Sequence, residues 1–286
     1  MKTSVSSYSF HGLTSTGKMT YNECIEKAKE FGIEGFEFSG LPKSNDILAT
    51  AKELGEACKS AGLAVTNYTI GADLLNGMGV PPEEEVDRLK KHVDIACALG
   101  AKGMRHDLLW GFTAIKREWR GFNEVLDMLV PKVREITQYA ESKGIRTMVE
   151  NHGYFAQDSE RMERLINKVA HTNFGLLIDI GNFLCVDEDP IIAVSRVAPY
   201  AFHVHAKDFH IKSGSEPNPG HGFFGTRGGN HLRGAIVGHG NVPVKQCLSI
   251  IKSAGYNDYV SIEFEGMEDP IIGVKVGHEN LKRYIH

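Results

Sequence analysis

Three features of this 286-residue sequence predict an α/β fold built from eight strand–helix units. Short apolar runs alternate with longer amphipathic runs along the chain, and helix-ending glycines recur before the next short run, as in KEFG, CALG and ESKG. No Pro- or Ser-rich linker divides the chain. Eight such units in about 250 residues are typical of a (β/α)8 TIM barrel. We therefore predict a single TIM-barrel domain over residues 1–286.

The strands are expected where short apolar runs rich in β-branched and aromatic residues occur. These runs cover residues 5–10, 33–38, 63–70, 102–109, 145–150, 174–179, 201–208 and 259–264. A doubly wound sheet is the alternative arrangement of such units, but no GxGxxG motif follows the first strand.

The helices are expected in the amphipathic runs between and after these strands. They cover residues 21–31, 44–61, 82–99, 117–143, 159–169, 190–197, 242–254 and 270–285. Thr20 is a candidate N-cap for the first helix, and prolines stand at the starts of three others.

The 209–241 segment interrupts this regular alternation. It separates the seventh strand from its helix and contains nine glycines and four histidines. A loop of this length without regular structure is usually functional or disordered. Because Phe223, Phe224, Arg227 and Arg233 give the segment groups for contacts, we predict a lid-like loop rather than a disordered tail.

Composition narrows the class of protein. Hydrophobic residues make up 42% of the chain, charged residues 24%, and the net charge is -4, so no basic surface for nucleic acid or anionic membrane is expected. Five scattered cysteines form no CxxC pair, and the N-terminus lacks the apolar run of a signal peptide. We predict a soluble cytoplasmic protein that binds neither nucleic acid nor membrane.

Polar side chains end four successive strands, at the barrel face where TIM-barrel active sites lie. The runs are MVENH, LLIDIGN, FHVHAKD and VSIEFEG. Because side chains alternate along a strand, inward positions hold Glu150, Asp179, Glu263 and either His205 or His203.

This constellation predicts a metal centre. Buried carboxylates repel each other unless a cation compensates their charge. Three carboxylates and one imidazole form an oxygen-rich donor set that favours Mn²⁺ first, with Mg²⁺, Co²⁺ or Zn²⁺ as alternatives. The competing interpretation is that hydrogen bonds or solvent satisfy each residue separately.

Together, the four motifs resemble the sugar phosphate isomerase/epimerase family of xylose-isomerase-like TIM barrels. This family includes ketose 3-epimerases, hydroxypyruvate isomerases and inosose dehydratases, with endonuclease IV more distant. The resemblance implies the metal ligands Glu150, Asp179, His205 and Glu263, with His205 selected by its HxKD motif, His205–Ala206–Lys207–Asp208. It also implies that Glu150 and Glu263 form a catalytic acid/base pair, and that the protein is a homodimer or homotetramer.

One position departs from this family pattern. Several relatives carry DxxH after the sixth strand, whereas this chain has Asp179–Ile180–Gly181–Asn182. Asparagine is a poor metal ligand, which argues against a multi-zinc nuclease site and makes Asn182 a candidate substrate contact.

Further candidate substrate-binding residues lie around the same barrel face. They are His152, Lys207, Arg105, His106 and Arg227, of which Arg105 and His106 end the fourth strand and only one is expected to face the mouth. His152 is also a candidate acid or base, and Arg227 has the fork geometry that suits a phosphate or carboxylate.

The leading hypothesis is a metal-dependent isomerase or epimerase of a small sugar, sugar phosphate or keto-sugar. Chelation of adjacent carbonyl and hydroxyl oxygens would stabilise the enediolate formed by proton removal next to the carbonyl. A second hypothesis is a lyase or dehydratase of a keto-inositol or keto-glycoside, with His152 as acid or base. A third is an endonuclease IV-like nuclease, and a fourth is a sugar-binding barrel without activity.

Overall fold

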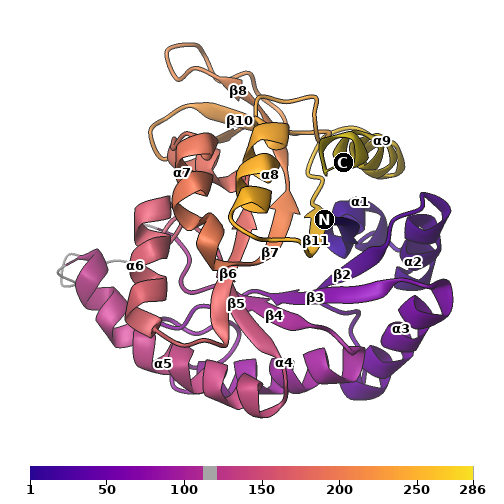
Figure 1. The fold of residues 1–286 in the computed structure, drawn as a ribbon, viewed down its shortest axis with the longest axis vertical. Helices are drawn as coiled ribbons and strands as arrows, with labels where there is room; N and C mark the ends of the chain where they lie inside the picture. Colours follow the sequence, from indigo (N-terminus) through magenta and orange to yellow (C-terminus); the bar gives the residue numbers. More distant parts are fainter. Residues whose placement is uncertain (112–120, 286) are drawn as a thin grey trace.

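The computed structural model describes residues 1–111 and 121–285, in which eight parallel strands close into a barrel (Figure 1). This confirms the predicted TIM barrel. Around the barrel, neighbouring strands follow in the order β1 (Lys2–Ser6), β11 (Tyr259–Ile262), β7 (Ala201–Ala206), β6 (Phe174–Asp179), β5 (Arg146–Glu150), β4 (Gly103–His106), β3 (Ala64–Ile70) and β2 (Gly35–Ser39).

Helices surround the barrel on its outside (Figure 1). The longer ones are α2 (Tyr21–Glu30), α3 (Ile47–Ala61), α4 (Glu85–Leu99), α5 (Phe122–Ser142), α6 (Ser159–Val169), α7 (Pro190–Val197), α8 (Val244–Ser253) and α9 (Pro270–Ile285). Short helical turns are η1 (Ser7–Phe10), α1 (His11–Thr14), η2 (Asn182–Val186) and η3 (Ala198–Tyr200). The predicted start of α5 at residue 117 lies outside the described residues.

The helix ends follow the sequence signals. Thr20 and Glu23 form a reciprocal capping box at the start of α2, which confirms the predicted N-cap. Gly62 and Gly100 end α3 and α4 with φ values of 81° and 71°, a left-handed conformation in which a side chain is strained.

The main apolar core lies between the barrel and its helices. On β7, Val204 and Ala206 belong to this core and are fully buried. The alternate residues His203 and His205 are also buried, but their rings hydrogen-bond inside the barrel, His203 to Ser261 on the adjacent β11 and both to Glu37 on β2. The predicted division of β7 into an apolar outer face and a polar inner face is therefore correct.

The first strand was placed too late in the sequence. The prediction covered residues 5–10, whereas β1 spans Lys2–Ser6 and residues 7–10 form η1. The polar Lys2 and Thr3 concealed the start of the strand, although they pair with Tyr259 and Val260 of β11. The serines that follow favour a turn, because their hydroxyls hydrogen-bond nearby backbone groups.

The 209–241 segment, predicted to be a lid-like loop, contains strands that the sequence analysis did not place. Strands β8 (Asp208–Lys212), β9 (Phe224–Gly225) and β10 (His231–Ala235) form an antiparallel sheet beyond the barrel (Figure 1). Phe209 and Leu232 pack with Cys185 in a small apolar cluster of their own. The Asp208 carboxylate closes the segment by accepting hydrogen bonds from the backbone N–H groups of residues 238, 240 and 242.

Within the described residues, no helix combines the length and apolar character needed to cross a membrane.

Candidate metal centre

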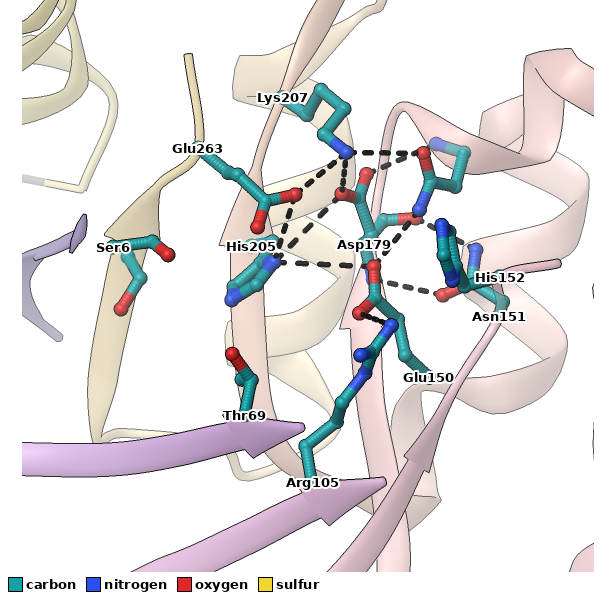
Figure 2. A network of polar contacts seen from close by, with 12 residues as sticks. Ser6, Thr69, Arg105, Glu150, Asn151, His152, Asp179, His205, Lys207 and Glu263 are labelled. Carbon is teal, nitrogen blue, oxygen red and sulfur yellow. Dashed lines mark hydrogen bonds and ion pairs between the residues drawn. The ribbon is translucent and has the colours of Figure 1, made fainter. Parts of the chain in front are cut away.

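Four side chains from four neighbouring barrel strands converge at one point (Figure 2). Glu150, Asp179 and His205 lie on β5, β6 and β7, and Glu263 directly follows β11. Each offers one ligand atom, and these four atoms lie within 4.8 Å of one another. The His205 Nδ1 atom is 3.4 Å from the Glu263 carboxylate, 3.8 Å from that of Asp179 and 4.0 Å from that of Glu150.

The convergence leaves two buried polar atoms without a hydrogen bond. Among the residues that the structure describes, His205 Nδ1 and Asp179 Oδ2 have no hydrogen-bond partner. Asp179 Oδ2 has an ion pair with Lys207 at 3.2 Å, whereas His205 Nδ1 faces carboxylate oxygens at 3.4 Å or more. A buried polar atom left unsatisfied in this way is destabilising. Both atoms point into the same cluster, and carboxylate and imidazole donors both suit a divalent cation. The residues present therefore fit a divalent metal ion.

Hydrogen bonds to neighbouring groups fix the orientation of Asp179. Its Oδ1 atom accepts from the backbone N–H groups of Gly181 and Asn182, so its Oδ2 atom is turned towards the cluster. The Asn151 side chain exchanges two hydrogen bonds with the Asp179 backbone. Burial, opposed by Lys207, raises the pKa of Asp179 to about 6.

Asn182 lies against the cluster but contributes no ligand atom to it. Its amide donates to Glu150 Oε1 over 2.9 Å, and its carbonyl oxygen accepts from Lys207 Nζ over 3.3 Å. The departure from the DxxH pattern thus replaces a metal-capable imidazole with a group that positions Glu150.

Lys207 brings a positive charge to the side of the cluster that Asp179 and Glu263 form. Its Nζ atom lies 2.6 Å from Glu263, 3.2 Å from Asp179 and 3.3 Å from Glu265. Burial lowers the pKa of Lys207, but these carboxylates outweigh burial and raise it well above its ordinary value. Burial raises the pKa of Glu263, but Lys207 and His205 outweigh burial, so that carboxyl is ionised.

A second polar group borders Glu150 and joins β4 to the loop after β5. Arg105 Nη2 lies 2.6 Å from Glu150 Oε2 and 2.8 Å from Asp107 Oδ1, and Asp107 in turn lies 2.9 Å from His152 Nδ1. Burial raises the pKa of Asp107, but Arg105 and His152 outweigh burial and lower it to about 2. Burial lowers the pKa of His152, but Asp107 outweighs burial and raises it.

His152 therefore forms a dyad with Asp107 at the rim of the metal cluster. Its side chain keeps 31% of its surface exposed, while Asp107 is 8% exposed. The two residues after His152, Gly153 and Tyr154, have φ values of 77° and 69°, a conformation that is unusual for tyrosine. This turn brings the His152 ring beside Asp107. A carboxylate that fixes one ring nitrogen of a partly exposed histidine is a common arrangement for proton transfer.

Two residues predicted to bind substrate do not join this group. His106 points to the other face of β4, where its Nδ1 atom lies 2.7 Å from the Asp107 carbonyl oxygen. Arg227 forms an ion pair with Asp158 over 3.0 Å, and its backbone N–H binds the Cys185 carbonyl. Of the two residues that end β4, Arg105 is the one that faces the cluster.

Sequence reasoning overlooked Asp107 and assigned no specific role to Asn151 or Glu37. Asp107 had a detectable signal, because it follows Arg105 by two residues and so shares its direction on an extended chain. Glu37 lies on β2, far from the four motifs in sequence, and gave no comparable signal.

A cavity of about 370 Å³ lies beside Glu265 at the barrel mouth. Its walls include Tyr8 and His11, whose rings stack 5.6 Å apart, and Phe224 of the 209–241 segment. Because Glu265 contacts Lys207, this cavity adjoins the metal cluster. One face of the 209–241 segment therefore lies next to the site.

Comparison with known proteins agrees with this architecture. Residues 25–284 match the family model of the xylose isomerase-like TIM barrel. An inosose dehydratase from Geobacillus thermodenitrificans is 24% identical over 274 residues, which cover 90% of this chain and 85% of that protein. These results place the chain among relatives that include enzymes.

Two solved structures show the same fold. The IolI protein, with a binding zinc atom, has a TM-score of 0.78 at 17% identity, with 100% of this chain and 98% of that chain covered. An L-ribulose 3-epimerase has a TM-score of 0.74 at 14% identity, with 99% and 94% covered. Together with the family match over residues 25–284, the closed eight-stranded barrel shows that this chain belongs to the xylose isomerase-like TIM barrel family.

Proposed function

We propose that this chain is a metal-dependent dehydratase of a cyclic polyhydroxy ketone. The reaction would begin with removal of a proton from the carbon next to the carbonyl. The observation that carries the proposal is the Asp107–His152 dyad beside Glu150, because elimination of water needs an acid for the departing hydroxyl as well as a base. The substrate class comes from the inosose dehydratases to which the chain is similar.

The metal ligands in this proposal are Glu150, Asp179, His205 and Glu263. When bound there, a divalent cation would polarise the substrate carbonyl and stabilise the negative charge that develops on proton removal. We propose Mn²⁺ as the first choice because three of the four donors are carboxylates. Zn²⁺ is the main alternative, since the IolI protein binds zinc on the same fold.

The two glutamates are the outer members of the cluster along the barrel wall. In strand order β5, β6, β7 and β11, Glu150 and Glu263 flank Asp179 and His205. One of these carboxylates would take the proton from carbon. His152, held by Asp107, would then protonate the hydroxyl on the next carbon as its C–O bond breaks and the C=C bond forms. Water leaves, and solvent returns a proton to His152 and removes one from the glutamate.

Polar side chains that are not metal ligands would hold the substrate hydroxyls. Arg105 and Lys207 lie at opposite ends of the cluster, and Ser6 and Thr69 face it from β1 and β3 (Figure 2). Asn182 lies between Glu150 and Lys207 and hydrogen-bonds to both. Such a donor-rich wall suits a polyhydroxylated substrate better than an apolar one.

The predicted isomerase or epimerase reaction is the second candidate function. The flanking positions of Glu150 and Glu263 favour it, because a carboxylate on each side allows a proton to be removed from one face and returned to another. Both candidates share the first proton transfer and differ only in the fate of the resulting enediolate.

The test is to incubate the metal-loaded protein with inososes and ketoses in deuterated water. A dehydratase yields an unsaturated ketone with new ultraviolet absorbance. An epimerase or isomerase instead yields product with deuterium at the carbon beside the carbonyl. If a bound substrate shows neither change with any of the four metals, both candidates are wrong.

Variants separate the two candidates further. His152→Gln should abolish dehydration while proton exchange persists, because Glu150 and Glu263 remain. Glu263→Gln should weaken both. Equal dehydration by wild type and His152→Gln would remove the observation that carries the proposal. The homodimer or homotetramer remains a prediction that light scattering would test.

A further inference from the structure

Glu37 is a fully buried carboxylate on β2, on the far side of the barrel from the loop that carries His152. Its exposed fraction is 0%, and its ion-pair partners among the described residues are two imidazoles. The Oε2 atom lies 2.8 Å from His205 Nε2 and 3.2 Å from His203 Nε2, and Oε1 accepts from Asn67 Nδ2 over 3.2 Å. A carboxylate this deeply buried is destabilising unless its hydrogen-bond partners compensate.

The hydrogen bond to Glu37 determines which nitrogen of His205 carries a proton. An ionised carboxylate only accepts, so at 2.8 Å the His205 Nε2 atom must donate. In the neutral ring the lone pair is then on Nδ1. Figure 2 shows this second nitrogen facing the carboxylates of Glu150, Asp179 and Glu263.

We infer that Glu37 is the positioning residue that fixes the tautomer and ring orientation of His205 for metal binding through Nδ1. The inference rests on the divalent metal centre proposed above. A charged acceptor on the distal nitrogen also increases the electron density that the imidazole offers to a cation. In the part of the chain that the structure describes, the hydrogen bonds and ion pairs of the Glu37 side chain go to Asn67, His203 and His205 and to none of the cluster carboxylates, so Glu37 acts through His205.

The contacts do not favour a second cation site between Glu37, His203 and His205. A tetrahedral site with bonds of about 2.0–2.1 Å separates its donor atoms by roughly 3.3 Å. The Glu37–His205 separation of 2.8 Å is that of a direct hydrogen bond. His203 Nε2 is also 2.9 Å from Ser261 Oγ, which gives it a further partner.

The decisive variant is Glu37→Gln, which keeps the size of the side chain and removes its charge. A matched control is Glu85→Gln, since Glu85 is also 0% exposed and ion-paired, with Arg88 at 2.7 Å, but lies on α4. For each metal-free protein, circular dichroism checks folding. Chelator competition then measures Mn²⁺ and Zn²⁺ affinity, elemental analysis gives the number of ions per chain, and ¹⁵N shifts of labelled histidine report the His205 tautomer.

The expected result is one ion per chain, with affinity about 10–100-fold weaker in Glu37→Gln and unchanged in Glu85→Gln. The wild type should show a protonated Nε2 on His205 when metal is bound. Equal affinity in a folded Glu37→Gln protein would overturn the inference while the metal centre stands. Two ions in the wild type and one in Glu37→Gln would overturn it in favour of a second site.

A wild-type protein that binds no metal would instead refute the proposed metal centre, and this inference with it. If Glu37→Gln does not fold, Asn67→Ala decides the matter, because it removes only the hydrogen bond that holds the other oxygen of Glu37. We then expect metal affinity to fall several-fold. An unchanged affinity in folded Asn67→Ala would overturn the inference.

Discussion

Lys207→Met is predicted to destabilise the metal-free protein strongly and the metal-bound protein much less. The ammonium group of Lys207 lies 2.6 Å from Glu263 and 3.2 Å from Asp179, and both of those carboxylates are buried. Methionine has nearly the same length but no charge. In the metal-free variant, the carboxylates of the cluster would repel each other without this cation between them.

The size of the effect can be worked out from these distances. At 3.2 Å and an effective dielectric constant of about 20, one pair contributes on the order of 5 kcal/mol, which desolvation of both charges offsets in large part. Removing one partner of a buried ion pair costs about 3–5 kcal/mol. We therefore expect the free energy of unfolding of metal-free Lys207→Met to fall by about 3–5 kcal/mol.

A bound divalent cation would replace much of the missing charge. The loss of unfolding free energy in Lys207→Met should therefore be smaller with metal than without it. Each 1.4 kcal/mol of that difference corresponds to about tenfold tighter metal binding by the variant than by the wild type. The assay is urea unfolding of both proteins with chelator and with saturating Mn²⁺ or Zn²⁺.

Lys102→Met is the control for this experiment. Lys102 forms an ion pair with Asp258 at 3.1 Å, but its side chain is 46% exposed, so its loss should cost less than about 1 kcal/mol with or without metal. A metal-free Lys207→Met protein as stable as the wild type would refute the electrostatic reasoning. So would a deficit that is the same with and without metal.

Three further predictions concern single side chains. Asp107→Asn should lower turnover by about 10–100-fold without loss of fold, because His152 loses the carboxylate that orients it. Steady-state kinetics measure this effect, and an unchanged turnover number would contradict the role of Asp107. Burial lowers the pKa of His92 to about 4, so the unfolded chain binds a proton that the folded chain does not between about pH 6.5 and 4. Stability should therefore fall by on the order of 1–3 kcal/mol as pH drops through that window, and His92→Gln should flatten this part of a urea-unfolding series. Arg227→Ala should leave KM nearly unchanged, since the Arg227 side chain pairs with Asp158, and a tenfold rise in KM would restore Arg227 as a substrate contact.

Short stretches of sequence were enough to predict the fold, because strands and helix ends each leave a pattern within a few residues. A strand repeats every two residues, and a glycine that follows an amphipathic run marks a helix end, so short stretches suffice to define eight strand–helix units. The two strands with the clearest apolar runs, β5 and β6, were placed within one residue of their observed bounds. The first strand was misplaced because its start is set by pairing with β11, in which Lys2 lies opposite Tyr259, and not by an apolar run of its own.

The same alternation predicted the grouping of Glu150, Asp179, His205 and Glu263. In a parallel barrel all strand ends of one kind meet on one face, so parity within each strand was enough to direct these side chains to a common point. The selection of His205 over His203 came from family resemblance. In the structure His205 is the one whose ring faces the three carboxylates.

Only the tertiary structure decided the contacts that cross the barrel or leave it. Glu37 reaches His205 because barrel closure places β2 across the interior from β7, and no local pattern records that distance. Arg227 pairs with Asp158 because the 209–241 segment folds into its own sheet and returns towards α6. The sequence alone thus determined the strand–helix units and the side chains directed at the cluster. Packing and strand register determined which partners hold those side chains in place.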